Sequence, residues 1–285
     1  MCASANTQKR KAVFLDIDGT LISRNGGSFA DDREAMEEAA GKGHLLFLNT
    51  GRSFANIPGV LFGLSALRGI AAGGGAHILL ADARGKNPGY QTIYHKWISD
   101  DQLALVFAWC ENHSRCCILE GERACYIINI NRSSWIFELD APIPVSSQDD
   151  FKKKSLGDFI TKLTFDSPMP EAAGAALTAH VSPLADDSRF LESFCTLNRF
   201  ADYTEGIIKG ENKAKAMKIV LDKMGIGRED SIAIGDSAND LDMIRFAGLG
   251  IAMGNACAEL KAAAGATTGA CGKGGVAEAL RNFVL

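Results

Sequence analysis

The sequence has no hydrophobic run long enough to cross a membrane as a helix. Its apolar stretches are short, and none approaches the ~20 uninterrupted apolar residues that such a helix requires. The first residues, MCASANTQKRKA, are polar and then basic, without the apolar core of a secretory signal. These two absences predict a protein that is neither secreted nor embedded in a membrane, and we expect a cytoplasmic location.

Clustered positive charge is also missing. The 285 residues carry a net charge of −4, and no block is rich in Lys and Arg. Nucleic-acid binding relies on such blocks, so the charge pattern argues against a nucleic-acid partner and favours small-molecule chemistry. The chain shows no internal repeat, and its length suits one large domain or a core with an inserted unit.

Cysteine pairs of the CxxC type are absent as well. Irregular spacing without a secretory signal predicts reduced thiols, although the adjacent Cys116 and Cys117 are an alternative candidate for redox sensitivity. The eight cysteines are Cys2, Cys110, Cys116, Cys117, Cys125, Cys195, Cys257 and Cys271.

Three short apolar runs predict strands that are buried on both faces. They are KAVFLD at residues 11–16, HLLFLNT at residues 44–50 and SIAIGD at residues 231–236. An acidic segment with helical periodicity, DDREAMEEAAGKG, separates the first two and completes a βαβ unit. The pattern predicts an α/β fold with an open parallel sheet, in which ligands bind beyond the carboxyl ends of the strands.

The middle of the chain follows a different pattern. Strand-like segments such as CCILE and FITKLTF alternate with helical ones, including a stretch at residues 170–180. This mixture predicts a separate α+β unit, entered through Gly-rich turns. We therefore expect residues 1–87 and 196–285 to form the sheet core and residues 88–195 to form the inserted unit.

Two aspartates stand at the end of the first predicted strand, in the stretch FLDIDGTLI. Asp16 and Asp18 could begin a calcium loop, but that pattern fails at Thr20, Leu21 and Gly27. They could also cap the following turn. The carboxyl end of a buried parallel strand is where catalytic residues of such sheets are found, which favours a catalytic role.

A second group of oxygen ligands follows the strand at residues 231–236. The stretch GDSANDLDM contains Asp236, Asn239 and Asp240, although one helix cap needs one such residue. Acidic groups at this density, facing Asp16 and Asp18 across neighbouring strands, would repel one another without a cation between them. Hard oxygen ligands of this kind suit Mg2+.

Two weaker signals complete the set. Thr50 and Gly51 follow the second strand, where a hydroxyl and backbone N–H groups can bind an anion, and an ordinary turn is the alternative. Lys213 lies near the start of a helical segment, where a solvated surface lysine is the alternative. The histidines show no metal-type spacing. Trp97, Trp109 and Trp135 are expected to pack within the inserted unit, and a substrate contact is the alternative.

In this order, the four elements resemble the haloacid dehalogenase-like (HAD) phosphohydrolases. DIDGT is similar to the first motif of the family, TGR to the second, Lys213 to the third and GDSAND to the fourth. The insertion, with GIAMGNA and KGGVAEAL, resembles the Cof-type branch, which has a large α/β cap (type IIB). The resemblance implies a Rossmann-like parallel core with helices on both faces, plus this inserted cap domain.

The chain departs from the family pattern at two places. Residues 74–76 are Gly-Gly-Ala, where similar proteins often have Asn-Gly-Ala, which puts the contact of that asparagine in doubt. Ala214 follows Lys213, where the family usually has a glycine, so Lys209, which precedes a glycine, is a rival for the third motif.

The resemblance implies a division of roles. Asp16 would attack phosphorus and form an aspartyl-phosphate, while Asp18 would protonate the leaving oxygen and later activate water. The carboxylates of Asp16 and Asp236 and the backbone carbonyl of Asp18 would hold Mg2+, with Asp240 supporting the metal through water or lysine. The phosphoryl oxygens would be bound by Thr50, Gly51, Lys213 and Asn239.

The implied activity is that of a Mg2+-dependent phosphatase. Its substrate would be a small phosphorylated metabolite, with sugar phosphates first among the candidates. One alternative is a phosphotransferase or phosphomutase that passes the phosphoryl group from Asp16 to a second hydroxyl. Another is a sensor that binds metal and metabolite without turnover.

Overall fold

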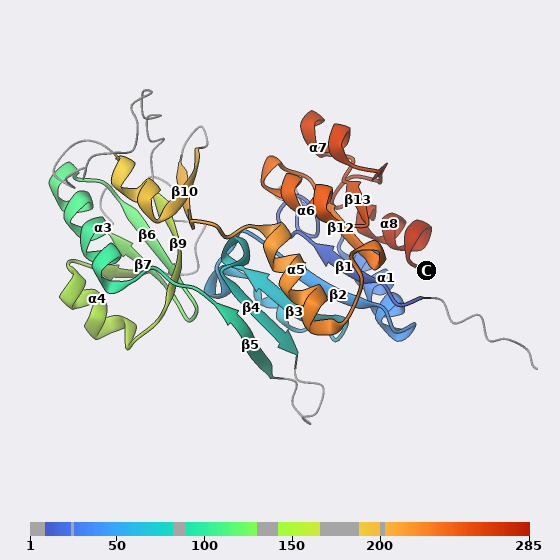
Figure 1. Ribbon diagram of the computed structural model, residues 1–285, viewed down its shortest axis with the longest axis horizontal. Helices are drawn as coiled ribbons and strands as arrows, with labels where there is room; N and C mark the ends of the chain where they lie inside the picture. Colours follow the sequence, from blue (N-terminus) through green and yellow to red (C-terminus); the bar gives the residue numbers. More distant parts are fainter. Residues whose placement is uncertain (1–8, 24–25, 82–88, 130–141, 166–187, 200–202) are drawn as a thin grey trace, which may run out of the picture.

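The computed structural model contains two β-sheets, each with its own helices (Figure 1). It describes residues 9–23, 26–81, 89–129, 142–165, 188–199 and 203–285. Cys2, Trp135 and the predicted helix at residues 170–180 lie outside these ranges. Within them, no helix combines the length and the apolar character that a membrane span needs.

The first sheet has the three predicted strands at its centre. Its order is β14-β13-β12-β1-β2-β3-β4-β5, and it is parallel from β14 to β3, with β4 and β5 added antiparallel at one edge. The strands are β1 (Ala12–Leu15), β2 (Leu45–Asn49), β3 (Leu67–Ala72), β4 (His77–Ala81), β5 (Tyr90–His95), β12 (Ser231–Gly235), β13 (Leu249–Ala252) and β14 (Ala266–Thr267). Every residue of β1, β2 and β12 is buried, which explains their unbroken apolar runs.

Six helices accompany the first sheet among the described residues. They are α1 (Ala30–Gly41), α2 (Gly59–Phe62), α5 (Lys213–Met224), α6 (Leu241–Phe246), α7 (Ala258–Ala263) and α8 (Gly275–Phe283). The helix α1 packs against α8, and α5 packs against α6. Short 3-10 turns η1 (Phe54–Asn56), η2 (Gly73–Gly75), η6 (Arg228–Asp230) and η7 (Ala238–Asp240) lie between these elements. The predicted α/β class with a Rossmann-like parallel core is thereby confirmed.

The second sheet has the order β10-β11-β9-β6-β7-β8. Its strands are β6 (Cys117–Gly121), β7 (Cys125–Ile128), β8 (Ile143–Val145), β9 (Ile160–Phe165), β10 (Cys195–Arg199) and β11 (Thr204–Ile208), with helices α3 (Asp100–His113) and α4 (Gln148–Ser155) and the 3-10 segment η5 (Ser188–Ser193). Ser99 and Gln102 form a capping box that begins α3. Trp109 on α3 packs edge-on against Phe165 with ring centroids 5.6 Å apart, so this tryptophan lies in the core of the second sheet.

Strand pairing at the two edges of the inserted unit bears on its expected bounds, residues 88 and 195, which stay a prediction. The strand β5 was assigned to the insertion but pairs with β4 of the first sheet, and β10 and β11 pair within the second sheet. The Lys96 amide donates to Ala76 of the first sheet, whereas the Ile98 amide donates to Ile160 of the second. We therefore propose that the chain enters the inserted unit between residues 96 and 98 and leaves it after residue 208.

The described cysteines agree with the expectation of reduced thiols. Among the described residues, no disulfide joins Cys110, Cys116, Cys117, Cys125, Cys195, Cys257 or Cys271, and the first five are buried.

Candidate functional site

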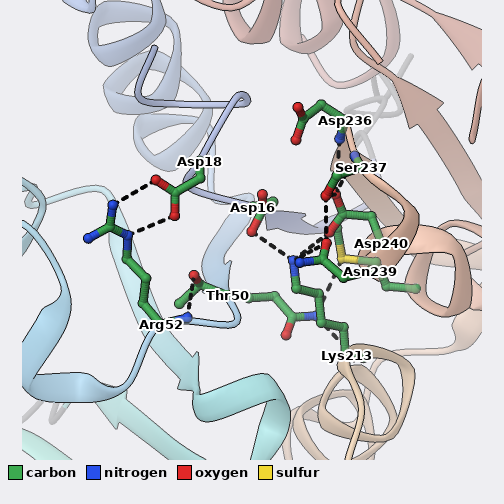
Figure 2. Close-up of polar contacts among 11 residues, drawn as sticks. Asp16, Asp18, Thr50, Arg52, Lys213, Asp236, Ser237, Asn239 and Asp240 are labelled. Carbon is green, nitrogen blue, oxygen red and sulfur yellow. Dashed lines mark hydrogen bonds and ion pairs between the residues drawn. The ribbon is translucent and has the colours of Figure 1, made fainter. Parts of the chain in front are cut away.

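Three neighbouring strands of the first sheet bring the predicted site residues together. The strand β1 lies between β2 and β12 and is parallel to both, so the residues after their carboxyl ends share one edge of the sheet. Asp16 follows β1, Thr50 follows β2 and Asp236 follows β12. Figure 2 shows these side chains around one centre, with Asn239 and Asp240 supplied by η7.

Lys213 lies at the middle of this group. Its Nζ donates to Asp16 Oδ1 at 2.7 Å and to Asp240 Oδ1 at 2.5 Å, and Asn239 Oδ1 lies 3.4 Å away. The side chain reaches back from the first residue of α5, as helical side chains do. The rival Lys209 instead donates to the Glu192 carbonyl, outside this group.

Asp240 is fully engaged by the protein itself. While Oδ1 accepts from Lys213, Oδ2 accepts from the backbone amides of Asp236 and Ser237, both at 3.0 Å. The residue is buried, so these contacts fix the turn after β12 and orient the lysine. Both oxygens of Asp240 therefore already accept hydrogen bonds from the protein, in contrast to Asp236 Oδ1.

Gly19 allows the first aspartate loop to approach Asp236 closely. Its φ is +77°, and a Cβ atom on it would lie 2.1 Å from Asp236 Oδ2. Asn255, which sequence reasoning did not assign, donates to the Gly19 carbonyl at 2.8 Å and to Asp236 Oδ2 at 3.3 Å. Asn255 lies in the GIAMGNA stretch just after β13, the parallel strand next to β12. This position after a strand end is the sequence feature that could have identified it as a site residue.

Arg52 is a second residue that sequence reasoning did not assign. Its guanidinium forms two parallel bonds of 2.7 Å to the carboxylate of Asp18. The same side chain donates to the Asn56 carbonyl at 2.9 Å, and the Arg52 amide donates to Thr50 Oγ1 at 3.1 Å. Figure 2 shows this fork beside Thr50, so one residue orients both Asp18 and the predicted anion-binding turn.

The Gly-Gly-Ala departure falls in the 3-10 turn η2. Gly74 has a φ of +64°, and its amide donates to the Thr50 carbonyl at 3.0 Å. A Cβ atom at this position would lie 2.9 Å from Ile207 Cγ2 of the second sheet. In this chain the backbone of Gly74 makes the contact with the Thr50 turn, and the space for a side chain is taken by Ile207.

The site carries more negative charge than Lys213 neutralises. Burial raises the pKa of Asp16 to about 8, and the charge of Asp240 adds to this shift while Lys213 opposes it. Burial, again with Asp240, raises the pKa of Asp236 to about 6. Burial alone would lower the pKa of Lys213, but Asp16 and Asp240 outweigh it and raise that pKa. An additional cation would relieve this imbalance.

The residues present fit such a cation. One carboxylate oxygen from each of Asp16, Asp236 and Asp240 lies within 4.8 Å of the others. Asp236 Oδ1 is buried and has no hydrogen-bond partner among the described residues, whereas both oxygens of Asp240 are already used. Asp16 and Asp236 are therefore the carboxylates best placed to hold a metal ion.

A cavity of about 890 Å³ opens over these groups. Asp16, Asp18 and Gly51 line it from the first sheet, and Lys162 and Glu205 line it from the second. The volume is typical of a small-molecule site. The inserted unit thus forms the wall opposite the aspartates.

Comparison with known proteins agrees with this geometry. A family model described as haloacid dehalogenase-like hydrolase matches residues 13–280. The stress response protein YhaX of Bacillus subtilis is 26% identical over 278 residues, covering 96% of this chain and 93% of that protein. The 5-amino-6-(5-phospho-D-ribitylamino)uracil phosphatase YcsE of the same organism is 25% identical over 280 residues, covering 96% of each.

Solved structures are similar in fold over nearly the whole chain. A HAD subclass IIB sugar phosphatase matches with a TM-score of 0.74 and 25% identity, covering 96% of this chain and 98% of that one. TM0651 from Thermotoga maritima matches with a TM-score of 0.76 and 21% identity, covering 97% and 98%, which is a likeness of fold. The predicted branch, with its large inserted unit, is confirmed.

Proposed function

The chain belongs to the haloacid dehalogenase-like hydrolases and is a phosphoric monoester hydrolase. From this premise we propose that it is a Mg2+-dependent phosphatase of a small sugar phosphate. The observation that carries the proposal is the buried contact between Asp16 and Lys213 on the wall of a small-molecule cavity. A carboxylate held at this depth can be a nucleophile, because the lysine fixes its position and, together with a bound cation, favours its ionised form.

The proposed metal is Mg2+ because the available donors are all oxygens. Asp16 and Asp236 would bind it through their carboxylates, and Asp18 through its backbone carbonyl. The buried, unpartnered Asp236 Oδ1 supports this assignment. When bound, the ion supplies positive charge that offsets the repulsion between a phosphate dianion and the aspartates.

In the proposed reaction Asp16 first takes the phosphoryl group. An oxygen of Asp16 forms a bond to phosphorus as the bond to the leaving alkoxide breaks, and the alkoxide takes a proton from Asp18. Lys213, the Gly51 amide and Thr50 hold the phosphoryl oxygens during this step. Water then attacks phosphorus and gives its proton to Asp18, which releases phosphate and restores Asp16.

The fork from Arg52 gives Asp18 a defined starting position. A guanidinium stabilises the ionised carboxylate, which is the form that accepts a proton from water in the second step. Donation of a proton to the leaving oxygen in the first step requires Asp18 to turn away from Arg52 and first to take up a proton from solvent. We therefore propose that substrate in the cavity exchanges the Asp18 contact with Arg52 for a contact with the leaving oxygen.

The chemistry of the opposite wall supports a sugar as the leaving group. Lys162 Nζ contacts Glu205 Oε1 at 2.6 Å and Glu120 Oε1 at 3.2 Å, so its charge is matched by two carboxylates. Among the described residues, this part of the cavity offers hydrogen bonds but no surplus positive charge for a second phosphate. Neutral hydroxyl groups suit it, in line with the sugar phosphatase of similar structure.

The test is a Mg2+-dependent phosphate-release screen over sugar phosphates, nucleotides, pyridoxal phosphate and pyrophosphate. We expect sugar phosphates to give the highest kcat/KM. Lys162→Met should raise KM for the sugar phosphate but leave turnover of p-nitrophenyl phosphate, which has no hydroxyl groups to bind, near the wild-type value. Absence of turnover across the whole panel would contradict the proposal, and product analysis with an added sugar acceptor separates hydrolysis from phosphotransfer.

A further inference from the structure

Two histidines meet at the junction of the sheets, although their distance in the sequence gave no reason to group them. His77 on β4 is the register partner of His95 on β5. Their rings stack with centroids 4.2 Å apart and planes inclined by 26°. Cross-strand neighbours of this kind present their side chains on the same face of a sheet.

A carboxylate from the inserted unit joins this pair. Glu122, in the turn between β6 and β7, places an oxygen within 4.8 Å of one ring nitrogen from each histidine. Its position is fixed by Asp158, whose Oδ1 accepts from the Glu122 amide at 3.1 Å and whose Oδ2 accepts from the Ala124 amide at 3.1 Å. The three groups therefore come from both sheets and lie close together, and because the two rings stack, one imidazole has to turn before both can direct a nitrogen at a common ion.

The histidines have ring nitrogens without a partner. His77 is fully buried, and within the described residues neither His77 Nδ1 nor His95 Nε2 has a hydrogen-bond partner. The other nitrogen of His77, Nε2, lies 3.1 Å from Thr92 Oγ1. A buried polar atom left unpaired costs about 1–3 kcal/mol, so two of them beside a carboxylate indicate a missing ligand.

We propose that His77, His95 and Glu122 form a second cation site, distinct from the aspartate site, for a divalent ion of the Zn2+ type. Two imidazoles and one carboxylate, with a fourth position for water, are a donor set that Zn2+ prefers and Mg2+ does not. Thr92 would orient His77 from behind by accepting a hydrogen bond from Nε2. Burial lowers the pKa of His77 to about 4, which agrees with a neutral, metal-binding ring.

Such an ion would fasten the two sheets to each other. His77 and His95 belong to the β4–β5 hairpin of the first sheet, and Glu122 belongs to the second. Trp97 and Phe159 cover His95, with ring centroids 5.4 Å and 5.1 Å from it. The ion would therefore hold the inserted unit in place over the aspartate cavity, at a site separate from the chemistry.

The test is calorimetric titration of Zn2+ into the metal-depleted full chain, with excess Mg2+ present to occupy the aspartate site. We expect one Zn2+ per chain. His95→Gln and Glu122→Gln should each weaken it by about tenfold or more, and Thr92→Val should weaken it to a smaller extent. Both His95 and Glu122 are partly exposed, so these variants are expected to fold, which far-UV circular dichroism checks.

Two controls make the result decisive. His113→Gln removes a histidine on α3 that contacts the Trp109 carbonyl, and Asp236→Asn disables the aspartate site; both should keep Zn2+ affinity. Co2+ should give the intense visible absorption of a four-coordinate nitrogen site in the wild type and in Asp236→Asn, but not in His95→Gln. Zn2+ affinity that is undetectable in the wild type, lost in Asp236→Asn or unchanged in His95→Gln would overturn the proposal.

Discussion

Replacing Asp236 by asparagine should make the metal-free protein more stable while it abolishes activity. Burial and the neighbouring charge of Asp240 raise the pKa of Asp236 to about 6, so the ionised side chain is unfavourable in the folded state. An asparagine keeps an oxygen that can accept the contact from Asn255 but carries no charge. The substitution therefore removes the free-energy cost of this negative charge in the folded state. In the wild type only a bound cation offsets that cost.

The size of this effect follows from the pKa shift. A change from 3.8 to about 6 is ~2 units, which is about 3 kcal/mol before screening. Asp236 is only half-buried, so solvent reduces this to about 1–2 kcal/mol. Below about pH 3 the carboxyl is protonated in both states; between about pH 3 and 6 the unfolded chain ionises first, and wild-type stability falls relative to the variant.

The assay is urea unfolding in a chelator at two pH values. The variant should be about 1–2 kcal/mol more stable than the wild type at about pH 7.5 and within about 0.5 kcal/mol of it at about pH 4. Added Mg2+ should reverse the order at the higher pH, because only the wild type binds the ion. The reasoning would be refuted if the variant were less stable than the wild type in chelator at about pH 7.5. It would also be refuted if the stability advantage of the variant were as large at about pH 4 as at about pH 7.5.

Three further predictions concern the contacts around the aspartates. Arg52→Lys cannot form two parallel bonds to Asp18, so kcat should fall by about 10–100-fold with little change in KM in steady-state assays; an unchanged kcat would contradict the proposed positioning. Gly19→Ala would force a Cβ into Asp236 and should lower the free energy of unfolding by about 1–3 kcal/mol and remove stabilisation by Mg2+ in thermal melts. Asn255→Ala should weaken Mg2+ binding by about tenfold in calorimetry, and equal affinity would show that its two contacts are incidental.

The centre of the fold was predictable because burial on both faces leaves a mark in the sequence. The segments KAVFLD, HLLFLN and SIAIGD each have an apolar centre, and each contains a fully buried strand. The edge of the sheet was not predictable in this way. The half-buried β5 has a pattern that suits either sheet. Its pairing with β4 cannot be inferred from the residues of β5 alone.

The site was predictable where residues follow strand ends and not where they reach it from loops. Asp16, Thr50 and Asp236 directly follow buried parallel strands, and that placement alone groups them. Arg52 was missed because its partner depends on the path of the turn between Thr50 and η1. The histidine pair was missed because strand register brings it together, and this register includes an irregularity between Ile78 and Leu79.

The measurement that tests the central claim most directly is acid-quench labelling with a radiolabelled sugar phosphate. In the presence of Mg2+, the wild type should carry label on Asp16 within a single turnover, and hydroxylamine should release it as expected of an acyl phosphate. Asp16→Asn, with its contact to Lys213 reduced to a neutral amide, should carry no label and show no Mg2+-dependent turnover. Normal turnover by Asp16→Asn, or label on another residue, would contradict the account.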